Sequence, residues 1–370
     1  MSIEVGKKMR AMIAMSGGVD SAVAALLMKE AGYDCTGVTM RLYRESGYQT
    51  SCEKSCCSDE DEEYAALVCW QLGIPHESLC FSGLFEKAVI RKFIHEYEAG
   101  RTPNPCIDCN RFLKFEALLE QAIKEGFDVL ATGHYARIAY SDELRRWQLF
   151  RAVDEKKDQS YVLYMLTQEQ LQHLRFPLGE LFKTDTRILA ETHNLVNAQK
   201  RDSQDICFIP DGDYAGFIRR RTGKTYPAGD ILDQSGSIVG RHRGLLCYTI
   251  GQRRGLGIAA GEPVYVIGKD LTSSTLVVGP NSALYRRELI ACDFNWLSIP
   301  KPDVPIRAFA RTRYHQREAA CTVYPLPADE VHIVFDEPQR AITPGQAVVL
   351  YKGDSLAGGG TITGDCPDSL

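Results

Sequence analysis

The sequence of 370 residues lacks a hydrophobic run long enough to cross a membrane. The apolar stretch near its start, Ala22 to Met28, is far shorter than the roughly 20 residues that a membrane span needs. No secretory cleavage pattern precedes it, so we expect no membrane association and a cytoplasmic location. A large excess of one charge is also missing, since 43 Lys and Arg face 48 Asp and Glu. With 44% hydrophobic and 25% charged residues the composition excludes disordered and fibrous classes, and the length predicts two or three domains.

Cysteine, in contrast, is abundant, with 13 residues. A reducing cytoplasm keeps thiols unpaired, so burial, metal binding and catalysis compete to explain them. Those in apolar or strand-like stretches are expected to be buried: Cys35, Cys69, Cys80, Cys247, Cys292 and Cys321. Those among Gly, Pro, Ser and Asp are candidates for chemistry: Cys52, Cys56, Cys57, Cys106, Cys109 and Cys207.

From Met9 to about Ile209, short apolar runs alternate with helical patterns, which is typical of an α/β domain with a parallel sheet. The pattern predicts strands at 10–15, 35–42 and 128–132 and helices at 19–31, 59–72, 84–98 and 112–125. For the last helix we expect a buried face of Leu113, Phe115, Leu118, Leu119 and Ile123.

After Ile209 the sequence changes to short alternating runs broken by Gly and Pro, which predict β-hairpins. The expected strands lie at 237–240, 264–267, 275–278 and 331–335, and two groups separate near Pro280. We therefore expect an α/β domain over 1–209, a small β-rich domain over 210–280 and a C-terminal β-barrel over 281–370. Between Tyr214 and Ala260, eight Arg and Lys face two Asp. Such a basic segment is either a surface for a polyanion or an ordinary solvated surface.

The run Ser-Gly-Gly-Val-Asp-Ser at 16–21 lies directly between a predicted strand and a predicted helix. Adjacent glycines allow the backbone to approach a ligand closely, and the N-terminus of the helix offers N–H groups to phosphate. The run is neither a Walker A loop nor a Gly-x-Gly-x-x-Gly fingerprint. Asp20 beside a phosphate site suits Mg²⁺. The alternative is a plain Gly-Gly turn that opens a helix.

The second motif holds Cys106 and Cys109 in a Cys-x-x-Cys spacing after the stiff run Thr-Pro-Asn-Pro at 102–105. Because a helix follows, we expect thiols with a lowered pKa. The spacing alone also suits a redox pair, half a zinc site, a cluster site or two surface thiols.

The loop at 16–21 resembles the PP-loop of the N-type ATP pyrophosphatases, which cleave ATP to AMP and pyrophosphate. Over essentially the whole chain, the motifs and their order resemble those of the tRNA-specific 2-thiouridylases. Besides the PP-loop, these motifs are Arg-Thr-Pro-Asn-Pro at 101–105 with Cys109-Asn110, Thr-Gly-His-Tyr at 132–135, Lys-Asp-Gln-Ser-Tyr at 157–161, Asp-Ser-Gln-Asp-Ile-Cys-Phe at 202–208, Tyr-Thr-Ile-Gly-Gln-Arg-Arg-Gly-Leu-Gly at 248–257, Arg-Thr-Arg-Tyr-His at 311–315 and Thr-Pro-Gly-Gln at 343–346.

This resemblance implies an ATP site lined by Ala14, Met15, Ser16, Gly17, Gly18, Val19, Asp20, Ser21, Met40 and Gly133. It implies that Asn104, Pro105 and Cys106 face the target base. It implies further contacts with tRNA from His134, Lys157, Asp158, Gln159, Arg313, Tyr314 and Gln346.

The resemblance also implies a catalytic set in which Cys109 is the nucleophile and Cys207 carries a persulfide. Cys106 and Asp20 are the other catalytic candidates. ATP with Mg²⁺ would adenylate O2 of the wobble uridine of tRNA, sulfur carried on a cysteine would displace AMP, and the second cysteine would resolve the resulting disulfide. A sulfur donor such as a cysteine desulfurase or a sulfur-relay protein is the implied partner.

Cys106 departs from many members of that family, which have Asp at this position. Three thiolates, from Cys106, Cys109 and Cys207, could hold a [4Fe–4S] cluster with one open iron, so the persulfide and cluster mechanisms both stay open. Cys52, Cys56 and Cys57 suit zinc, a sulfur relay or a plain loop. Two other functions suit parts of the sequence: a PP-loop amide-forming ligase, which would not need Cys109 and Cys207, and a non-catalytic metal-stabilised RNA-binding module, which would not need the ATP loop.

Overall fold

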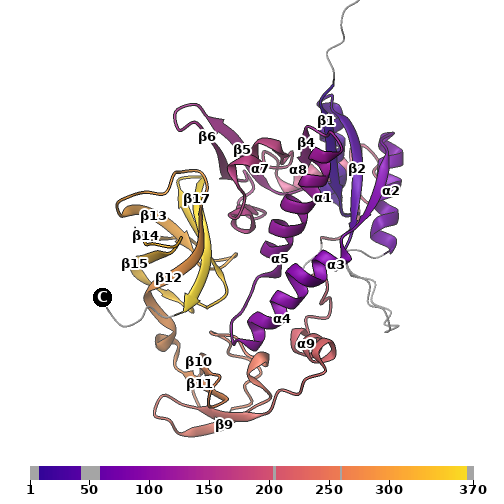
Figure 1. The fold of residues 1–370 in the computed structure, drawn as a ribbon. Coiled ribbons are helices and arrows are strands. Elements are labelled where there is room, and N and C mark those ends of the chain that lie inside the picture. The colour runs from indigo at the N-terminus through magenta and orange to yellow at the C-terminus, as the bar shows by residue number, and fades with distance from the viewer. Residues whose placement is uncertain (1–7, 43–58, 203–205, 259–260, 365–370) are drawn as a thin grey trace, which may run out of the picture.

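The computed structural model describes residues 8–42, 59–202, 206–258 and 261–364. Figure 1 shows three parts in chain order: an α/β part in indigo and magenta, a small sheet in salmon and a barrel in orange and yellow. In these ranges no helix is long and apolar enough to span a membrane. The predicted sites at Cys52, Cys56 and Cys57 lie outside the described residues.

The α/β part is built on a five-stranded sheet in the order β3-β2-β1-β4-β7, and every neighbouring pair is parallel. The prediction of a parallel sheet is therefore confirmed. Its strands are β1 Arg10–Met15, β2 Asp34–Arg41, β3 His76–Cys80, β4 Val129–Ala131 and β7 Leu174–Arg175.

Helices cover both faces of this sheet because alternate side chains of its strands point to opposite sides. From β1, Ala11 and Ile13 pack in one core with the helices at 19–30, 59–72 and 183–192, whereas Met12 packs in another with the helices at 82–98 and 105–124. The helices on the first face are α1 Val19–Glu30, α2 Asp59–Leu72 and α8 Lys183–Thr192. The described chain also contains α7 Gln168–His173 and the short 3₁₀ turns 160–163, 245–247 and 281–284.

Two long helices on the second face each contain a π-helical section. One comprises α3 Ser82–Phe85, η1 Glu86–Ile90 and α4 Arg91–Glu98, and the other comprises α5 Pro105–Asp108, η2 Cys109–Leu118 and α6 Leu119–Lys124. The second begins earlier than predicted, because Asn104 Oδ1 accepts a hydrogen bond from Cys106 N at 3.1 Å and Pro105 suits the first helical position.

The predicted buried face of this helix is confirmed at Leu113, Phe115, Leu118 and Leu119, which are at most 4% exposed. It is wrong at Ile123, which is 47% exposed. Ala122, 1% exposed, completes the buried face instead, because positions 115, 118, 119 and 122 follow the i, i+3, i+4, i+7 spacing of one helix face and Ile123 lies off it.

The small sheet has the order β10-β11-β8-β9. Its strands are β8 Gly229–Leu232, β9 Ile238–His242, β10 Tyr265–Asp270 and β11 Thr275–Gly279, and α9 Tyr214–Thr222 precedes it. Ile231, Val266 and Leu276 are fully buried in its core.

The C-terminal strands form a closed six-stranded barrel, since β12 pairs with both β15 and β17. The strands are β12 Tyr285–Trp296, β13 Ile306–Arg311, β14 Ala319–Pro325, β15 Val331–Arg340, β16 Ala347–Lys352 and β17 Ser355–Gly364. The expected β-rich domains are thus confirmed, and the last is a barrel.

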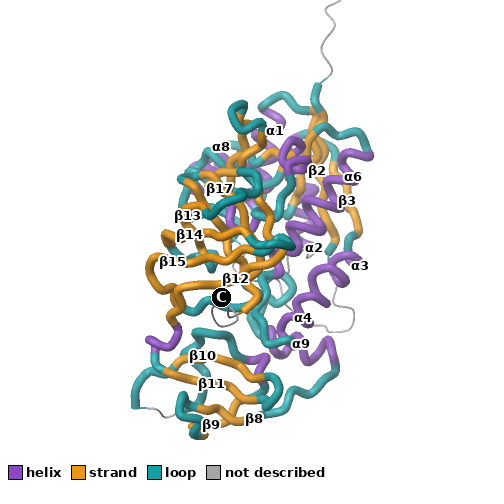
Figure 2. The backbone as a smooth tube through the Cα atoms, turned by 60° about the vertical axis from the view of Figure 1, so that its left-hand side comes forward, coloured by secondary structure: helices purple, strands orange, loops and turns teal. Residues whose placement is uncertain are grey.

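A hairpin from the α/β part, β5 Ala136–Ser141 and β6 Arg146–Arg151, extends the barrel sheet by pairing with β17. Leu149 N donates to Ser298 Oγ at 3.1 Å within this junction. The small sheet is fastened to α4 through Glu98, which accepts from Lys224 Nζ at 2.8 Å and from Tyr226 Oη at 2.6 Å. Figure 2 shows these parts packed side by side. The three parts therefore make specific polar contacts with one another.

Burial of the cysteines follows the prediction only in part. Cys35, Cys69 and Cys321 are buried, but Cys247 and Cys292 are half-buried. Cys80 is exposed because it ends β3, an edge strand.

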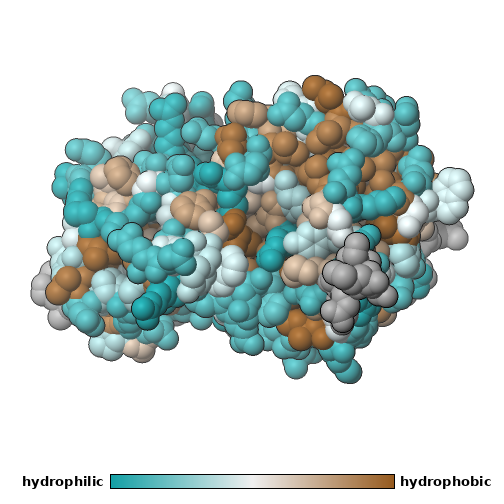
Figure 3. Space-filling view, turned by 90° about the horizontal axis from the view of Figure 1, so that it is seen from above, coloured by the Kyte–Doolittle hydropathy of each residue, from teal (hydrophilic) through white to brown (hydrophobic). Residues whose placement is uncertain are grey.

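In Figure 3, apolar residues gather over the α/β part more than over the barrel.

Candidate active site

The predicted phosphate loop connects the end of β1 to the start of α1. Gly17 has φ +69°, and a Cβ added to it would lie 2.2 Å from the carbonyl oxygen of Asp61 in α2, so only glycine fits. Ser21 Oγ donates to Gly18 O at 2.9 Å and accepts from Ser16 N at 3.2 Å, which closes the loop. Gly18 provides no side-chain cap to α1. The first N–H groups of α1 therefore have no side-chain cap from Gly18, as a helix end that binds an anion requires.

The other residues expected to line the ATP site lie at the same edge of the sheet. Ala14 and Met15 end β1, Met40 is near the end of β2, and Gly133 follows β4. A Cβ at Gly133 would lie 2.8 Å from Asp20 C and 2.9 Å from Ser21 N, so its bare backbone packs directly against the start of α1. The carboxyl ends of neighbouring parallel strands are where open α/β sheets bind ligands.

Asp20, at the second position of α1, is the acidic group of this loop. Its Oδ1 accepts a hydrogen bond from Lys183 Nζ at 2.7 Å and another from Tyr135 Oη at 2.9 Å. The Asp20 side chain is still 35% exposed. One accessible carboxylate beside a phosphate loop fits Mg²⁺, which proteins bind through one or two carboxylates together with substrate phosphates.

Asp202 forms a second charged centre next to Asp20. It accepts hydrogen bonds from Lys157, Lys183 and Arg187, each at 2.8 Å. Burial raises the pKa of Asp202, but the hydrogen bonds from Lys157 and Lys183 outweigh it and lower that pKa to about 2. Sequence reasoning missed Lys183 and Arg187, although their spacing of four places them on one face of a helix.

The cysteine motif lies where the second long helix begins. Cys106 is exposed, whereas Cys109 and Cys207 are half-buried. Cys109 and Cys207, although far apart in the sequence, both pack against the large core that extends from the sheet to α9 and the barrel. The structure thus brings the two expected catalytic cysteines to one core.

The expectation of a lowered thiol pKa is wrong for Cys106. Although the side chain is exposed, the surrounding protein desolvates its thiolate and raises the pKa, and Asp108 adds to this while Lys114 opposes it. Asp108, between the two cysteines, is 6% exposed and pairs with Lys92 Nζ at 2.7 Å. Burial raises the pKa of Asp108 as well. Desolvation of the thiolate, with a smaller contribution from Asp108, therefore raises the pKa of Cys106 despite its place at a helix N-terminus.

Cys106, Cys109 and Cys207 do not form an assembled metal site. Among the described residues, which include Cys106, Cys109 and Cys207, no group of three or more His, Cys, Asp or Glu side chains is placed to hold a metal ion. The three-thiolate donor set of a [4Fe–4S] cluster is therefore not preformed.

The residues expected to face the target base and nearby tRNA are mostly engaged in local contacts. Asn104 caps the helix, and Pro105 is buried at its first position. His134 is 8% exposed and its Nδ1 lies 2.7 Å from Thr132 Oγ1. Burial, followed by the charge of Lys114, lowers the pKa of His134 well below its ordinary value. Its imidazole is therefore neutral at pH 7.

The side chains of the motif at 157–161 make contacts within the protein. Lys157 pairs with Asp202, and Gln159 Oε1 accepts from Tyr135 N at 3.0 Å. Asp158, 5% exposed, accepts from Ser160 N at 3.1 Å and from Arg311 Nη1 at 3.3 Å.

The expected tRNA contacts from the barrel likewise join parts of the protein. Arg313 Nη2 donates to Ile250 O at 3.1 Å and Thr343 Oγ1 at 2.8 Å, which connects the small sheet to the barrel. Tyr314 Oη donates to Asp158 O at 3.0 Å. Gln346 Nε2 donates to Thr102 O at 2.7 Å and so fastens the segment before Cys106 to the barrel.

The basic segment is only partly available to a partner. Arg221 pairs with Glu86 and Lys224 with Glu98, both on the α/β part. Arg253 and Arg254 are exposed. The segment thus combines internal ion pairs with an exposed basic tip.

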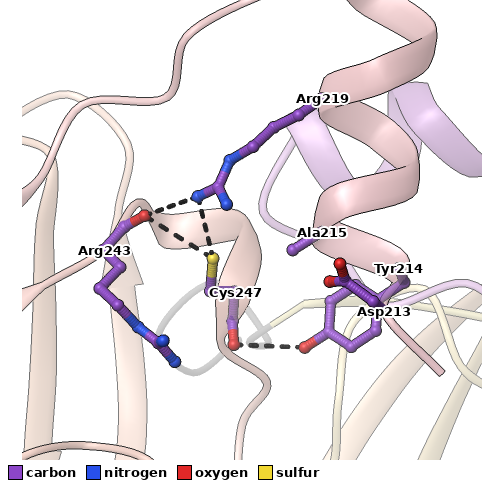
Figure 4. Close-up of a pocket in the computed structure, with 6 residues that line it drawn as sticks. All are labelled: Asp213, Tyr214, Ala215, Arg219, Arg243 and Cys247. Carbon is purple, nitrogen blue, oxygen red and sulfur yellow. Dashed lines mark hydrogen bonds between the residues drawn. The ribbon is translucent and has the colours of Figure 1, made fainter. Parts of the chain in front are cut away.

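A cavity of about 190 Å³ lies between α9 and the small sheet (Figure 4). Its lining residues are Asp213, Tyr214, Ala215, Arg219, Arg243 and Cys247. Arg219 Nη2 donates to Arg243 O at 2.9 Å and to Cys247 Sγ at 3.4 Å. The guanidinium of Arg219 is thus paired with other residues of the cavity wall. The cavity contains none of the residues expected to be catalytic.

The fold and the loop define a nucleotide-binding α/β domain with two β domains appended. Family models agree: residues 9–211 match the "tRNA methyl transferase HUP domain", 215–280 the "tRNA methyl transferase PRC-barrel domain" and 286–362 the "Aminomethyltransferase beta-barrel domain".

Curated relatives identify the family more narrowly. The protein named tRNA-specific 2-thiouridylase MnmA from Acetivibrio thermocellus is 48% identical over 96% of this chain and 99% of its own. Relatives of the same name from Symbiobacterium thermophilum and Carboxydothermus hydrogenoformans are also 48% identical, over 95% and 97% of this chain and 92% and 98% of theirs. The chain therefore belongs to the tRNA-specific 2-thiouridylase family.

Among solved structures, NMN synthetase from Francisella tularensis is 15% identical over 60% of this chain and 79% of that chain, with a TM-score of 0.33. This likeness is too slight to support an inference.

Proposed function

We propose that this protein is a tRNA uridine 2-sulfurtransferase that converts the wobble uridine to 2-thiouridine in the cytoplasm. The names of the relatives support sulfur transfer rather than the methyl transfer in the family-model names. The observation that carries the proposal is the packing of Cys109 and Cys207 against one core that also contains Met12 of β1, the strand leading into the phosphate loop.

The first step activates the base. O2 of uridine attacks the α-phosphorus of ATP, a P–O bond forms, and the bond to pyrophosphate breaks with its electron pair on the pyrophosphate. The proton on N3 passes to solvent. The loop at 16–21 would hold the phosphates through backbone N–H groups, and Asp20 would hold Mg²⁺, which supplies charge neutralisation.

The second step transfers sulfur. A persulfide on Cys207, loaded by a sulfur donor of the desulfurase or relay class, attacks C2, and AMP leaves with the former O2 of uridine. Cys109 thiolate then attacks Cys207 Sγ, which releases 2-thiouridine and leaves a Cys109–Cys207 disulfide. An external thiol reductant must reduce that disulfide before the next turnover.

The cluster alternative differs in its need for iron. The described thiols form no assembled metal site, and the proposed steps use the thiols of Cys109 and Cys207 alone. Iron analysis of protein purified without oxygen tests this choice. An active wild-type protein free of iron supports the persulfide mechanism, whereas about four irons per chain that disappear together with activity in Cys106→Asp would reverse it.

The test of the proposed function is mass analysis of tRNA nucleosides after incubation with protein, ATP, Mg²⁺, a persulfide source and dithiothreitol. We expect 2-thiouridine from the wild type and none from Cys109→Ser or Cys207→Ser, with tRNA affinity nearly unchanged. Cys292→Ser, which alters another half-buried cysteine, is the matched control. Normal 2-thiouridine formation by either of the first two variants would exclude the mechanism. Amide formation without thiolation would favour the ligase alternative, and tRNA binding without ATP turnover the binding-module alternative.

A further inference from the structure

Lys183 bridges two carboxylates that belong to different segments of the α/β part. Its Nζ lies 2.7 Å from Asp20 Oδ1 and 2.8 Å from Asp202 Oδ1. The residue is the first of α8, and its backbone N donates to Asp154 Oδ2 at 3.0 Å, which fixes the start of that helix. The Lys183 side chain is only 11% exposed, so its charge is held at the edge of the phosphate loop.

The two carboxylates depend on Lys183 to different degrees. Asp202 also pairs with Lys157 and Arg187. For Asp20, Lys183 is the ion-pair partner found within the described ranges. Lys157, Lys183 and Arg187 together exceed the two carboxylates by one positive charge. Lys183 can therefore turn away from both carboxylates while Asp202 keeps two cations.

Asp20 stays accessible at the start of the helix that follows the phosphate loop. Asp20 lies in the first turn of α1 and is 35% exposed, so a metal ion can reach its carboxylate. A lysine ammonium on its four-carbon stem is a compact charge that can move between neighbouring oxygens. A phosphate at the helix N-terminus would offer Lys183 a more highly charged partner than Asp20.

We propose that Lys183 is a further catalytic residue, which pairs with Asp20 when ATP is absent and moves to phosphoryl oxygens of ATP when Asp20 binds Mg²⁺. This inference rests on the proposed ATP chemistry. As the bond between the α-phosphorus and the pyrophosphate oxygen breaks, the electron pair stays on that oxygen, and Lys183 neutralises its charge. Lys183 thus pairs with the metal-binding carboxylate of Asp20 before ATP binds, and it stabilises the pyrophosphate leaving group once ATP is bound.

Two binding measurements without tRNA test this exchange. Calorimetry with ATP and excess Mg²⁺ should give a Kd at least about tenfold higher for Lys183→Met than for the wild type, because a charge-assisted hydrogen bond is removed. Electron paramagnetic resonance of Mn²⁺ without nucleotide should instead give severalfold tighter binding in Lys183→Met, because Asp20 loses its competing cation. A lysine with a purely structural role would not strengthen metal binding.

Two further variants serve as controls. Lys156→Met removes a neighbouring exposed lysine and should change neither measurement. Arg187→Met removes a cation from Asp202 but not from Asp20, so it should leave Mn²⁺ binding at its wild-type strength.

ATP affinity equal to the wild type in folded Lys183→Met, or unchanged Mn²⁺ binding, would overturn the inference. If Lys183→Met does not fold, the same measurements on Lys183→Gln decide, since its amide can still donate to Asp20 and Asp202. Failure of the wild type to form AMP or 2-thiouridine would count against the proposed function instead. The ATP and Mn²⁺ binding measurements would still test the role of Lys183 in that case.

Discussion

Gly133→Ala should damage the ATP site with little damage to the rest of the fold. The added Cβ would lie 2.8 Å from Asp20 C and 2.9 Å from Ser21 N, and both are backbone atoms that cannot rotate away. Ordinary contacts between carbon atoms are about 3.5–4.0 Å, so the start of α1 must shift by roughly 1 Å. Overpacking of this kind costs about 1–3 kcal/mol.

The larger effect should be on ligand binding, because the displaced segment is the helix N-terminus that offers N–H groups to phosphate. A misplacement of this size costs on the order of 100-fold where geometry decides the interaction. We therefore expect at least a tenfold rise in the Kd for ATP, measured by calorimetry, with a modest decrease in the urea midpoint. Gly83→Ala is the matched control, since a Cβ there meets nothing within 4 Å.

Wild-type ATP affinity in Gly133→Ala would refute this reasoning, because the nucleotide could not then depend on the start of α1. A large loss of stability together with ATP binding would also count against it, since the damage would not be local to the site.

Three further predictions concern charge. Asp20→Ala should suppress formation of both AMP and pyrophosphate in a tRNA-dependent assay, and stoichiometric ADP and phosphate from the wild type would contradict the PP-loop chemistry. Arg253 and Arg254 are exposed, and neutralising both should weaken tRNA binding. The slope of log affinity against log salt should fall by about 1 for each phosphate that the protein no longer neutralises. An unaltered slope would mean that the two arginines face away from the RNA. The pKa of Asp202 is about 2 in the folded protein against an ordinary 3.8, so its ionised form stabilises the fold above pH 3.8 and this contribution disappears as pH falls towards 2. After allowance for solvent screening, the contribution of this carboxylate to the free energy of unfolding is about 1 kcal/mol. The difference in urea midpoint between wild type and Asp202→Asn should therefore narrow from pH 7 to pH 3. A difference that stays constant would show that the charge of Asp202 does not stabilise the fold.

Local periodicity predicted the α/β core well because its signals lie within each segment. The strand at 10–15 and the helix at 59–72 have the predicted bounds. The phosphate loop was found for the same reason, since strand, Gly-Gly turn and helix are contiguous in the sequence. A site built from adjacent residues is visible without knowledge of the tertiary structure.

Features that depend on distant partners were missed. The hairpin β5–β6 completes its pairing with β17 of the barrel, which no local pattern could indicate. The pairing of Asp20 with Lys183 joins two helices, α1 and α8, that are far apart in the sequence. The thiol pKa of Cys106 was predicted in the wrong direction because desolvation depends on the packed surroundings, which a helix position alone does not reveal.

The inward contacts of the expected tRNA residues change how their substitutions should be interpreted. Arg313 donates to Ile250 O and Thr343 Oγ1, and Gln346 donates to Thr102 O just before the cysteine turn. Removing either side chain would loosen the junction that positions Cys106, whether or not the same side chain also contacts RNA. A loss of thiolation in such a variant is therefore compatible with a purely positioning role. Only a change in the salt dependence of tRNA binding would assign a phosphate contact to Arg313, because a displaced cysteine turn alters turnover without changing the number of counterions released.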